Sequence, residues 1–272
     1  MPELPEVETI RRDLQQAVAG CRIKDVEILD PRVLRGISSQ DLSKALAGRV
    51  VHSIERRGKA LVFNISGPRP FLVVQLMMTG QLVVASCPSD APAKKLSLIF
   101  GRQLFVHYND VRVFGQWRLV RDLGRINYFH VLGPEPLSRG FTPARLAEEL
   151  SRRHVAVKAF LMDHRRVAGI GNIYASEILF RAGIDPRRRT DELTFDEAAA
   201  LHSAVREVLK SAVRLRGTTM NDYLDGRGRR GRYMDEIKVY KKDGQPCPVC
   251  GTEVERIVQA QRSTFFCPRC QF

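Results

Sequence analysis

The hydrophobic pattern of the chain changes its period part-way along, and this change limits the folds that the chain can adopt. Between about residues 22 and 120, short stretches alternate apolar and polar residues, and Gly, Pro, Asn or Ser separates them. Such stretches predict an antiparallel β-sandwich or barrel. From about residue 140, apolar residues instead recur at helical spacing. The sequence therefore predicts an α+β protein of two domains that meet near residues 133–140.

A separate helix is predicted at the start of the chain. Pro5 and the acids beside it suit the first turn of a helix, and apolar residues follow at helical spacing at Val7, Ile10, Leu14, Ala17 and Val18. This pattern does not explain Pro2 and Glu3, because both precede the helix.

Two local patterns predict helix starts in the second half. Thr194 and Glu197 form a capping box for a helix that runs to about residue 215. The turn at residues 168–172 contains two glycines, and Asn172 is expected to cap the helix behind it. Exposed N–H groups at that helix start favour an anion. Alone, the turn could be an ordinary helix connection, but on a strongly basic chain we favour a phosphate-binding turn.

Four cysteines near the C-terminus have the spacing of a zinc site. The pattern is C-x2-C-x16-C-x2-C, formed by Cys247, Cys250, Cys267 and Cys270. Four thiolates in two such pairs suit tetrahedral zinc, whereas two disulfides would be unexpected in a reducing compartment. Nothing nearby supplies an open coordination position, so we expect one structural Zn2+. The residues between the pairs alternate like a β-hairpin that carries Arg262.

The net charge of +14 favours a polyanionic partner, most simply nucleic acid. The glycine-rich, basic segment 217–233 is expected to be a flexible linker or a mobile loop lying on phosphates or over a site, and these readings are compatible. The chain contains no apolar run long enough to span a bilayer and no signal-peptide pattern. We therefore expect a cytoplasmic protein that does not bind membranes.

Together these features resemble bacterial formamidopyrimidine-DNA glycosylases over essentially the whole length of the chain. The order and spacing of the matching motifs make a chance match very improbable. The motifs are PELPEVE at 2–8, RRGK at 56–59, MTG at 78–80, RVFG at 112–115, LGPEPL at 132–137, KAFLMD at 158–163, GIGNIYASE at 169–177, VYKK at 239–242 and QRSTFFCPRC at 261–270.

The resemblance implies the domain organisation of a monomeric, zinc-containing repair enzyme. It places a catalytic domain of N-terminal helix and β-sandwich at residues 1–133 and a helix–two-turn–helix DNA-binding domain at 134–216. A mobile basic loop at 217–239 and a zinc-finger hairpin at 240–272 follow. The implied substrate is double-stranded DNA that contains oxidised bases or abasic sites.

The resemblance also implies the chemistry. Removal of oxidised purines, such as 8-oxoguanine and formamidopyrimidines, would be followed by β,δ-elimination at the abasic site. Pro2 is implied as the nucleophile once Met1 is removed, and Glu3 as the proton donor. Lys59 is implied in β-elimination, and Arg262 in δ-elimination and phosphate binding.

Seven further residues fall on DNA-contact positions of the family. Met78, Arg112 and Phe114 match residues that fill the gap left by an extruded base; the others are Arg153, Lys158, Asn172 and Tyr240. The sequence departs from the family pattern at Gln75, Met77, Val113 and Asn221 and in the Arg-rich segment 225–232. These departures bear on affinity and base preference more than on the reaction.

Two alternatives remain open at this point. An endonuclease VIII-like glycosylase would act on oxidised pyrimidines, although Leu4 and the three gap-filling residues favour the purine enzyme. A non-catalytic zinc-ribbon protein would bind DNA without cutting it. Cleavage assays on defined lesions would distinguish the first alternative from the purine enzyme, and borohydride trapping would distinguish the second.

Overall fold

The computed structural model describes residues 1–89 and 91–272 and divides them into two compact units. The first unit comprises Met1–His130 and Leu215–Met234, and the second comprises Val131–Arg214 and Asp235–Phe272. The chain thus returns to the first unit after building most of the second. The predicted α+β class is confirmed, whereas the predicted domain boundaries remain a prediction.

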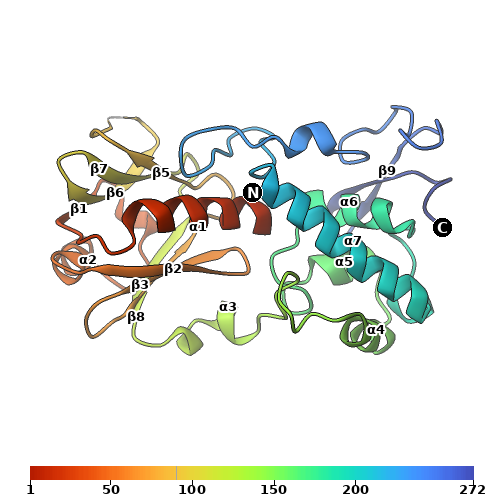
Figure 1. The fold of residues 1–272 in the computed structure, drawn as a ribbon, viewed down its shortest axis with the longest axis horizontal. Coiled ribbons are helices and arrows are strands. Elements are labelled where there is room, and N and C mark those ends of the chain that lie inside the picture. The colour runs from red at the N-terminus through yellow and green to blue at the C-terminus, as the bar shows by residue number, and fades with distance from the viewer. Residues whose placement is uncertain (90) are drawn as a thin grey trace. The chain divides into compact units, whose positions relative to one another are not determined.

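The first unit contains two four-stranded antiparallel sheets, as the alternating pattern predicted (Figure 1). One sheet has the strand order β1 (Asp25–Ile28), β6 (Lys94–Gly101), β7 (Leu104–Asn109) and β5 (Gln81–Ala85). The other has the order β2 (Val51–Arg57), β3 (Ala60–Ile65), β4 (Phe71–Gln75) and β8 (Gln116–Val120). Three helices accompany them: α1 (Leu4–Val18), α2 (Ser39–Leu46) and α3 (Asn127–His130).

Helix α1 is built into the core of this unit. Its apolar stripe, from Val7 through Leu14 to Val18, is fully buried and joins side chains of both sheets in one hydrophobic cluster. Burial of such a stripe stabilises the helix more than its intrinsic propensity does. The predicted helix near Pro5 is confirmed, and the residues just before it are attached to a rigid element.

The second unit carries four α-helices and a two-stranded hairpin (Figure 1). The helices are α4 (Pro143–Ser151), α5 (Val157–Met162), α6 (Asn172–Ala182) and α7 (Phe195–Arg214), and the hairpin strands are β9 (Glu255–Gln259) and β10 (Arg262–Phe266). The predicted capping box at the start of α7 is confirmed. The Thr194 N–H donates to Glu197 Oε2 at 2.8 Å, and the Glu197 N–H donates to Thr194 Oγ1 at 3.2 Å.

Among the described residues, no helix combines the length and the apolar character needed to cross a bilayer.

Candidate active site and DNA-binding residues

Pro2 and Glu3 are buried at the start of the first unit, immediately before α1. The Glu3 N–H donates to Glu6 Oε2 at 2.8 Å, and the second oxygen of Glu6 accepts from the Thr218 N–H at 2.7 Å. Glu6 is itself 2% exposed. A buried carboxylate with two backbone donors is a firm anchor, because charge-assisted hydrogen bonds are stronger than neutral ones. The start of the chain is therefore held against the loop that contains Thr218.

In this structure Met1 precedes Pro2, so the proline nitrogen is part of a peptide bond. An amide nitrogen is not a nucleophile, because its lone pair is delocalised into the carbonyl group. Removal of Met1 would convert that nitrogen into a secondary amine at the same place in the fold.

Lys59 lies in the tight turn between β2 and β3. Its backbone N–H donates to the hydroxyl of Tyr128 at 2.8 Å, and Gly58 before it adopts a positive φ of 59°. The β2 end of this hairpin is joined to α1, because Arg56 Nε lies 3.4 Å from Glu8 Oε2.

Glu8 on α1 is a charged anchor for that hairpin. Burial alone would raise the pKa of Glu8, but hydrogen bonds from Arg11 and Arg12 and the charge of Arg56 hold the pKa below its ordinary value. Glu8 therefore stays ionised and keeps the hairpin bearing Lys59 attached to the helix that follows Pro2.

The three predicted gap-filling residues come together on the first unit. Met78 and Phe114 are 41% and 45% exposed, which is high for large apolar side chains. The guanidinium carbon of Arg112 lies 4.6 Å from the centre of the Phe114 ring, and its Nη1 lies 3.2 Å from Met78 Sδ. A cation stacked on an aromatic ring beside an exposed thioether has the composition expected of an apolar wedge with one positive charge, and we call these three residues the wedge.

Buried Asp110 holds the two segments that carry the wedge. Its carboxylate accepts hydrogen bonds from Thr79 Oγ1 at 2.5 Å, Tyr108 OH at 2.9 Å and the Gly115 N–H at 2.8 Å. Asp110 therefore fixes both segments that carry the wedge. Between the wedge residues, Val113 has a φ of 56°, which is strained for a β-branched residue. Backbone strain of this kind persists where the surrounding contacts over-determine the conformation.

In the second unit, the predicted phosphate-binding residues Lys158 and Asn172 converge on the zinc hairpin. Lys158 is 2% exposed and donates to the Ser263 carbonyl at 3.0 Å and to Thr264 Oγ1 at 2.7 Å. Asn172 Nδ2 donates to the same Ser263 carbonyl at 2.9 Å. These contacts fix strand β10 directly behind Arg262, which is exposed.

The prediction that Asn172 caps α6 is wrong. Gly171 is the N-cap, and Asn172 is the first residue of the helix. The amide of Asn172 instead binds the hairpin carbonyl, and its buried Oδ1 has no hydrogen-bond partner among the described residues.

Tyr240 and Arg153 are positioned by different contacts in the second unit. The backbone N–H of Tyr240 donates to Glu177 Oε1 at 2.9 Å, and its ring packs edge-on against Phe265 of the hairpin with centroids 5.1 Å apart. Glu177 is 3% exposed and accepts from the backbone N–H groups of Lys238, Val239 and Tyr240. Arg153 follows α4, and its carbonyl accepts from Thr190 Oγ1 at 2.7 Å.

The four predicted zinc ligands meet at one point. Their sulfur atoms all lie within 4.8 Å of one another, with 3.8 Å between Cys247 and Cys270 and 3.4 Å between Cys250 and Cys267. Tetrahedral zinc with bonds of about 2.3 Å requires sulfur–sulfur distances of about 3.8 Å. The four thiolates therefore fit one structural zinc ion, and they would complete its coordination.

Comparison with known proteins agrees with these arrangements. The N-terminal domain of formamidopyrimidine-DNA glycosylase matches residues 1–117, and the H2TH domain of the same enzyme matches residues 132–223. A zinc finger found in FPG and IleRS matches residues 244–271. The chain belongs to the formamidopyrimidine-DNA glycosylase family.

Members of this family match the chain from end to end. A formamidopyrimidine-DNA glycosylase of Symbiobacterium thermophilum is 47% identical over 100% of this chain and 89% of its own length. One from Laribacter hongkongensis is 44% identical, with both chains fully covered. Among solved structures, Lactococcus lactis Fpg with DNA containing an abasic site aligns with a TM-score of 0.91 at 35% identity, covering 99% of each chain. The Thermus thermophilus protein aligns at 0.87 and 40%, covering 99% of this chain and 98% of its own.

The structure also shows supporting residues that the sequence analysis missed. Glu6 joins Glu3 to Thr218, and its signal was present in the sequence, because it lies three residues after the N-cap. Asp110 and Glu177 gave no such signal. Asp110 and Glu177 both accept hydrogen bonds from backbone N–H groups that only the folded chain brings to them. Gly115 lies just five residues after Asp110, but no local sequence pattern indicates that contact.

Proposed function

We propose that this protein is a bifunctional DNA glycosylase and abasic-site lyase of base-excision repair that removes oxidised purines. Support comes from full-length relatives in this family and from solved relatives that hold DNA containing Fapy-dG or an abasic site. The observation that carries the proposal is the buried Pro2–Glu3 pair, held on α1 by Glu6. DNA as substrate also suits the net charge of +14. We place the protein in the cytoplasm, on the nucleoid while it acts.

The terminal amine of Pro2 is the proposed nucleophile because it is less basic than a lysine amine, so more of it is unprotonated at neutral pH. A chain-terminal amine has a reference pKa near ~8, so roughly a tenth is unprotonated at pH 7, whereas Lys has a reference pKa near ~10.4. The amine attacks C1′ of the extruded nucleotide, and the electrons of the bond to the base leave with the base. The proline nitrogen then loses its proton, which neutralises the departing base.

Glu3 then donates a proton to the sugar ring oxygen as the bond between C1′ and that oxygen opens. The nitrogen of the resulting proline iminium carries no hydrogen, so the iminium stays cationic and accepts electrons. Loss of a C2′ proton breaks the bond to the 3′ phosphate, and a second elimination breaks the bond to the 5′ phosphate. We assign assistance in the first elimination to Lys59 and in the second to Arg262.

The remaining predicted residues serve binding in this proposal. The wedge of Met78, Arg112 and Phe114 fills the gap left by the extruded base. Arg153, Lys158, Asn172 and Tyr240 contribute to binding of the phosphate backbone, with Lys158 and Asn172 acting through the hairpin strand that they hold. We propose residues 1–133 as the catalytic domain, residues 134–216 as the helix–two-turn–helix DNA-binding domain, residues 217–239 as a mobile basic loop and residues 240–272 as the zinc-finger hairpin.

Borohydride trapping tests this proposal on a duplex with 8-oxoguanine opposite cytosine. Protein that begins at Pro2 should form a covalent adduct, whereas protein that retains Met1 should not. Peptide mapping of the adduct should locate it on Pro2. An adduct on Lys59, or equal trapping with Met1 retained, would overturn the assignment of the nucleophile. Binding without trapping or strand scission would favour the non-catalytic alternative.

A further inference from the structure

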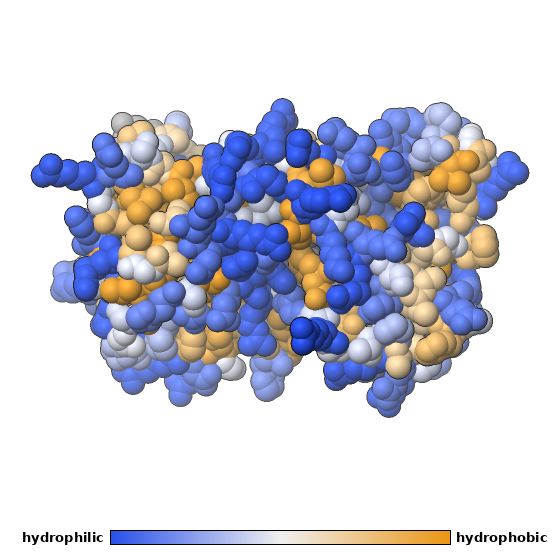
Figure 2. All heavy atoms as spheres, viewed as in Figure 1, coloured by the Kyte–Doolittle hydropathy of each residue, from blue (hydrophilic) through white to orange (hydrophobic). Residues whose placement is uncertain are grey.

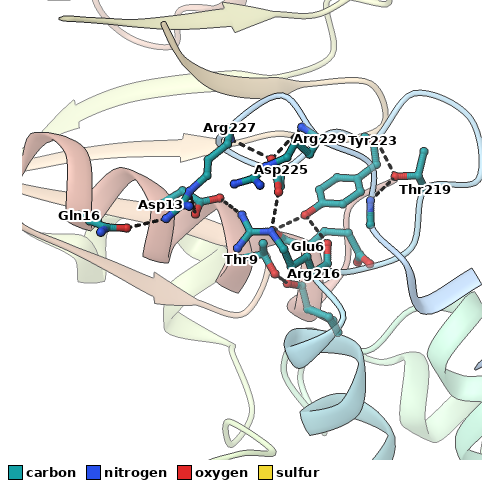
Figure 3. A network of polar contacts seen from close by, with 12 residues as sticks. Glu6, Thr9, Asp13, Gln16, Arg216, Thr219, Tyr223, Asp225, Arg227 and Arg229 are labelled. Atoms are coloured by element: carbon teal, nitrogen blue, oxygen red, sulfur yellow. Dashed lines mark hydrogen bonds and ion pairs between the residues drawn. The ribbon is translucent and has the colours of Figure 1, made fainter.

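The loop formed by Leu215–Met234 is fastened to helix α1 by a charged contact (Figure 3). Asp13 of α1 is 5% exposed, and its two oxygens accept from Arg216 and, at 3.1 Å, from Arg227 Nε. Arg227 also donates to Gln16 Oε1 at 2.6 Å. Two of the loop's arginines are therefore directed toward the protein and neutralised by it.

A second buried carboxylate, Asp225, fixes the shape of the same loop (Figure 3). It accepts from Arg216 Nε at 2.5 Å and from the backbone N–H groups of Arg227 and Arg229, each at 2.9 Å. The Gly226 carbonyl, next in the chain, accepts from the Val84 N–H of edge strand β5 at 2.8 Å. The loop thus has a defined backbone path with anchors on α1 and on β5.

The two ends of this loop, which we call its arms, pair with each other beside the start of the chain. Arg232 and Thr218 form an antiparallel bridge, and the Thr218 N–H binds Glu6, which also binds the Glu3 N–H. Gly231 fixes the arm further, because its N–H donates to Thr219 Oγ1 at 2.8 Å. A side chain at Gly231 would collide with the Gly217 carbonyl, so the two arms are tightly paired here.

Arg230 and Arg232 flank this tight point, and their charges are not neutralised. Both side chains are exposed, and neither forms an ion pair with any residue in the described ranges. In Figure 2, strongly hydrophilic residues cover the loop where it passes α1. These two unpaired guanidinium groups stand on a fixed backbone that Thr218 and Glu6 link to Glu3. Because that backbone is already ordered, binding an anion here would cost only the freedom of the two side chains.

We propose that Arg230 and Arg232 form a phosphate-binding pair that contacts the DNA backbone beside the nucleotide entering the Pro2–Glu3 site. The proposal rests on the proposed function, because it takes the polyanion to be the damaged duplex. Guanidinium groups match phosphate with two parallel hydrogen bonds, and contacts of this kind set register and affinity without reading sequence. The pair therefore adds to lesion binding through a loop in which Arg216 and Arg227 are already paired with Asp13.

The salt dependence of DNA binding tests this proposal. Fluorescence anisotropy would measure Kd between 50 and 200 mM KCl on a duplex that carries a tetrahydrofuran abasic analogue. For the double variant Arg230→Gln/Arg232→Gln, the slope of log Kd against log salt should fall by about 2, roughly one per lost phosphate contact. The double lysine variant should recover most of the slope, since it keeps both charges.

A matched control lies in the same unit. Arg102 is exposed and without an ion pair among the described residues, and it sits in the β6–β7 turn, at the end of β7 away from Asp110. Arg102→Gln should leave the slope unchanged. An unchanged slope in the double glutamine variant, or equal changes in the variant and in Arg102→Gln, would overturn the proposal. Failure of the unmodified protein to trap with borohydride would instead count against the proposed function.

Discussion

The zinc hairpin and the N-terminal site both hold chemically important groups in fixed positions, but the contacts that fix them differ in sequence range. In the hairpin, the four converging thiols lie between residues 247 and 270. At the N-terminal site, Glu6 binds the Thr218 N–H across 212 positions, and Asp13 binds Arg216 across 203. The hairpin can therefore form from one local segment, whereas the N-terminal site exists only when the chain has returned to the first unit.

This difference has a physical origin. A metal ion contributes binding energy directly to the short loop that supplies its ligands, so little loop-closure entropy opposes the site. Contacts between residues some 200 positions apart form only after the chain between them, which includes most of the second unit, has folded or closed into a long loop. Disruption should consequently stay local in the hairpin, whereas at the N-terminal site it should reach from α1 to the loop.

The largest expected effect comes from zinc removal. Structural zinc in such modules contributes on the order of 10 kcal/mol of apparent folding free energy. A chelator, or Cys267→Ser, should unfold residues 244–271 and release Ser263 from Lys158 and Asn172, with loss of lesion binding. Hydrogen exchange should show rapid exchange in the hairpin and continued protection of β3 and β7. Equal loss of protection in the first unit would contradict the local character of the site.

A smaller effect is expected from Asp13→Asn, which tests the long-range contact. Breaking a buried ion pair costs about 3–5 kcal/mol, but Arg216 and Arg227 are partly exposed, so we expect about 2 kcal/mol lower unfolding free energy. Urea unfolding measures this change. Trypsin should also cut after Arg229 or Arg230 faster in the variant, since the loop loses its anchor on α1.

The control for Asp13→Asn is Glu27→Gln in the same unit. Glu27 also forms an ion pair, with Lys94 at 3.0 Å, but among the described residues it forms no ion pair with the loop. This variant should leave the trypsin pattern unchanged. Accelerated loop cleavage in both variants would show that loop opening follows global stability rather than the Asp13 contact.

The smallest expected effect concerns a local electrostatic contact at the start of α7. A hydrogen bond from Arg188, with burial acting against it, holds the pKa of Glu197 at about 2, below its ordinary value of 4.5. A depressed carboxyl pKa contributes stability above pH 4.5 that is lost as the pH falls toward 2. Because both side chains are partly exposed, the contribution should be about 1 kcal/mol or less.

Glu197→Gln isolates this contribution. The variant should be less stable than the unmodified protein in urea at pH 7, and the gap should narrow by pH 3. A gap that does not change with pH would show that the capping hydrogen bonds, and not the charge pair, account for the effect.

Sequence patterns predicted the elements that depend on nearby residues. The alternating stretches became antiparallel strands, Thr194 and Glu197 became a capping box, and the cysteine spacing became a four-sulfur cluster. The expectation for Asn172 failed although it used the same kind of local reasoning. A carbonyl of the distant hairpin competes for the amide, and such competition is invisible in a local window.

By itself, the sequence determined where strands and helices form, where zinc fits and which family the chain resembles, because side-chain periodicity and ligand spacing are properties of neighbouring residues. Only the tertiary structure decided that Glu6 joins Glu3 to Thr218, that Asp110 carries the wedge, and that the loop's arginines divide into paired and unpaired groups. The arginines look alike in the sequence. Whether a charge is neutralised depends on which carboxylate the fold places beside it, and for Arg216 and Arg227 that carboxylate, Asp13, lies on a helix more than 200 residues away.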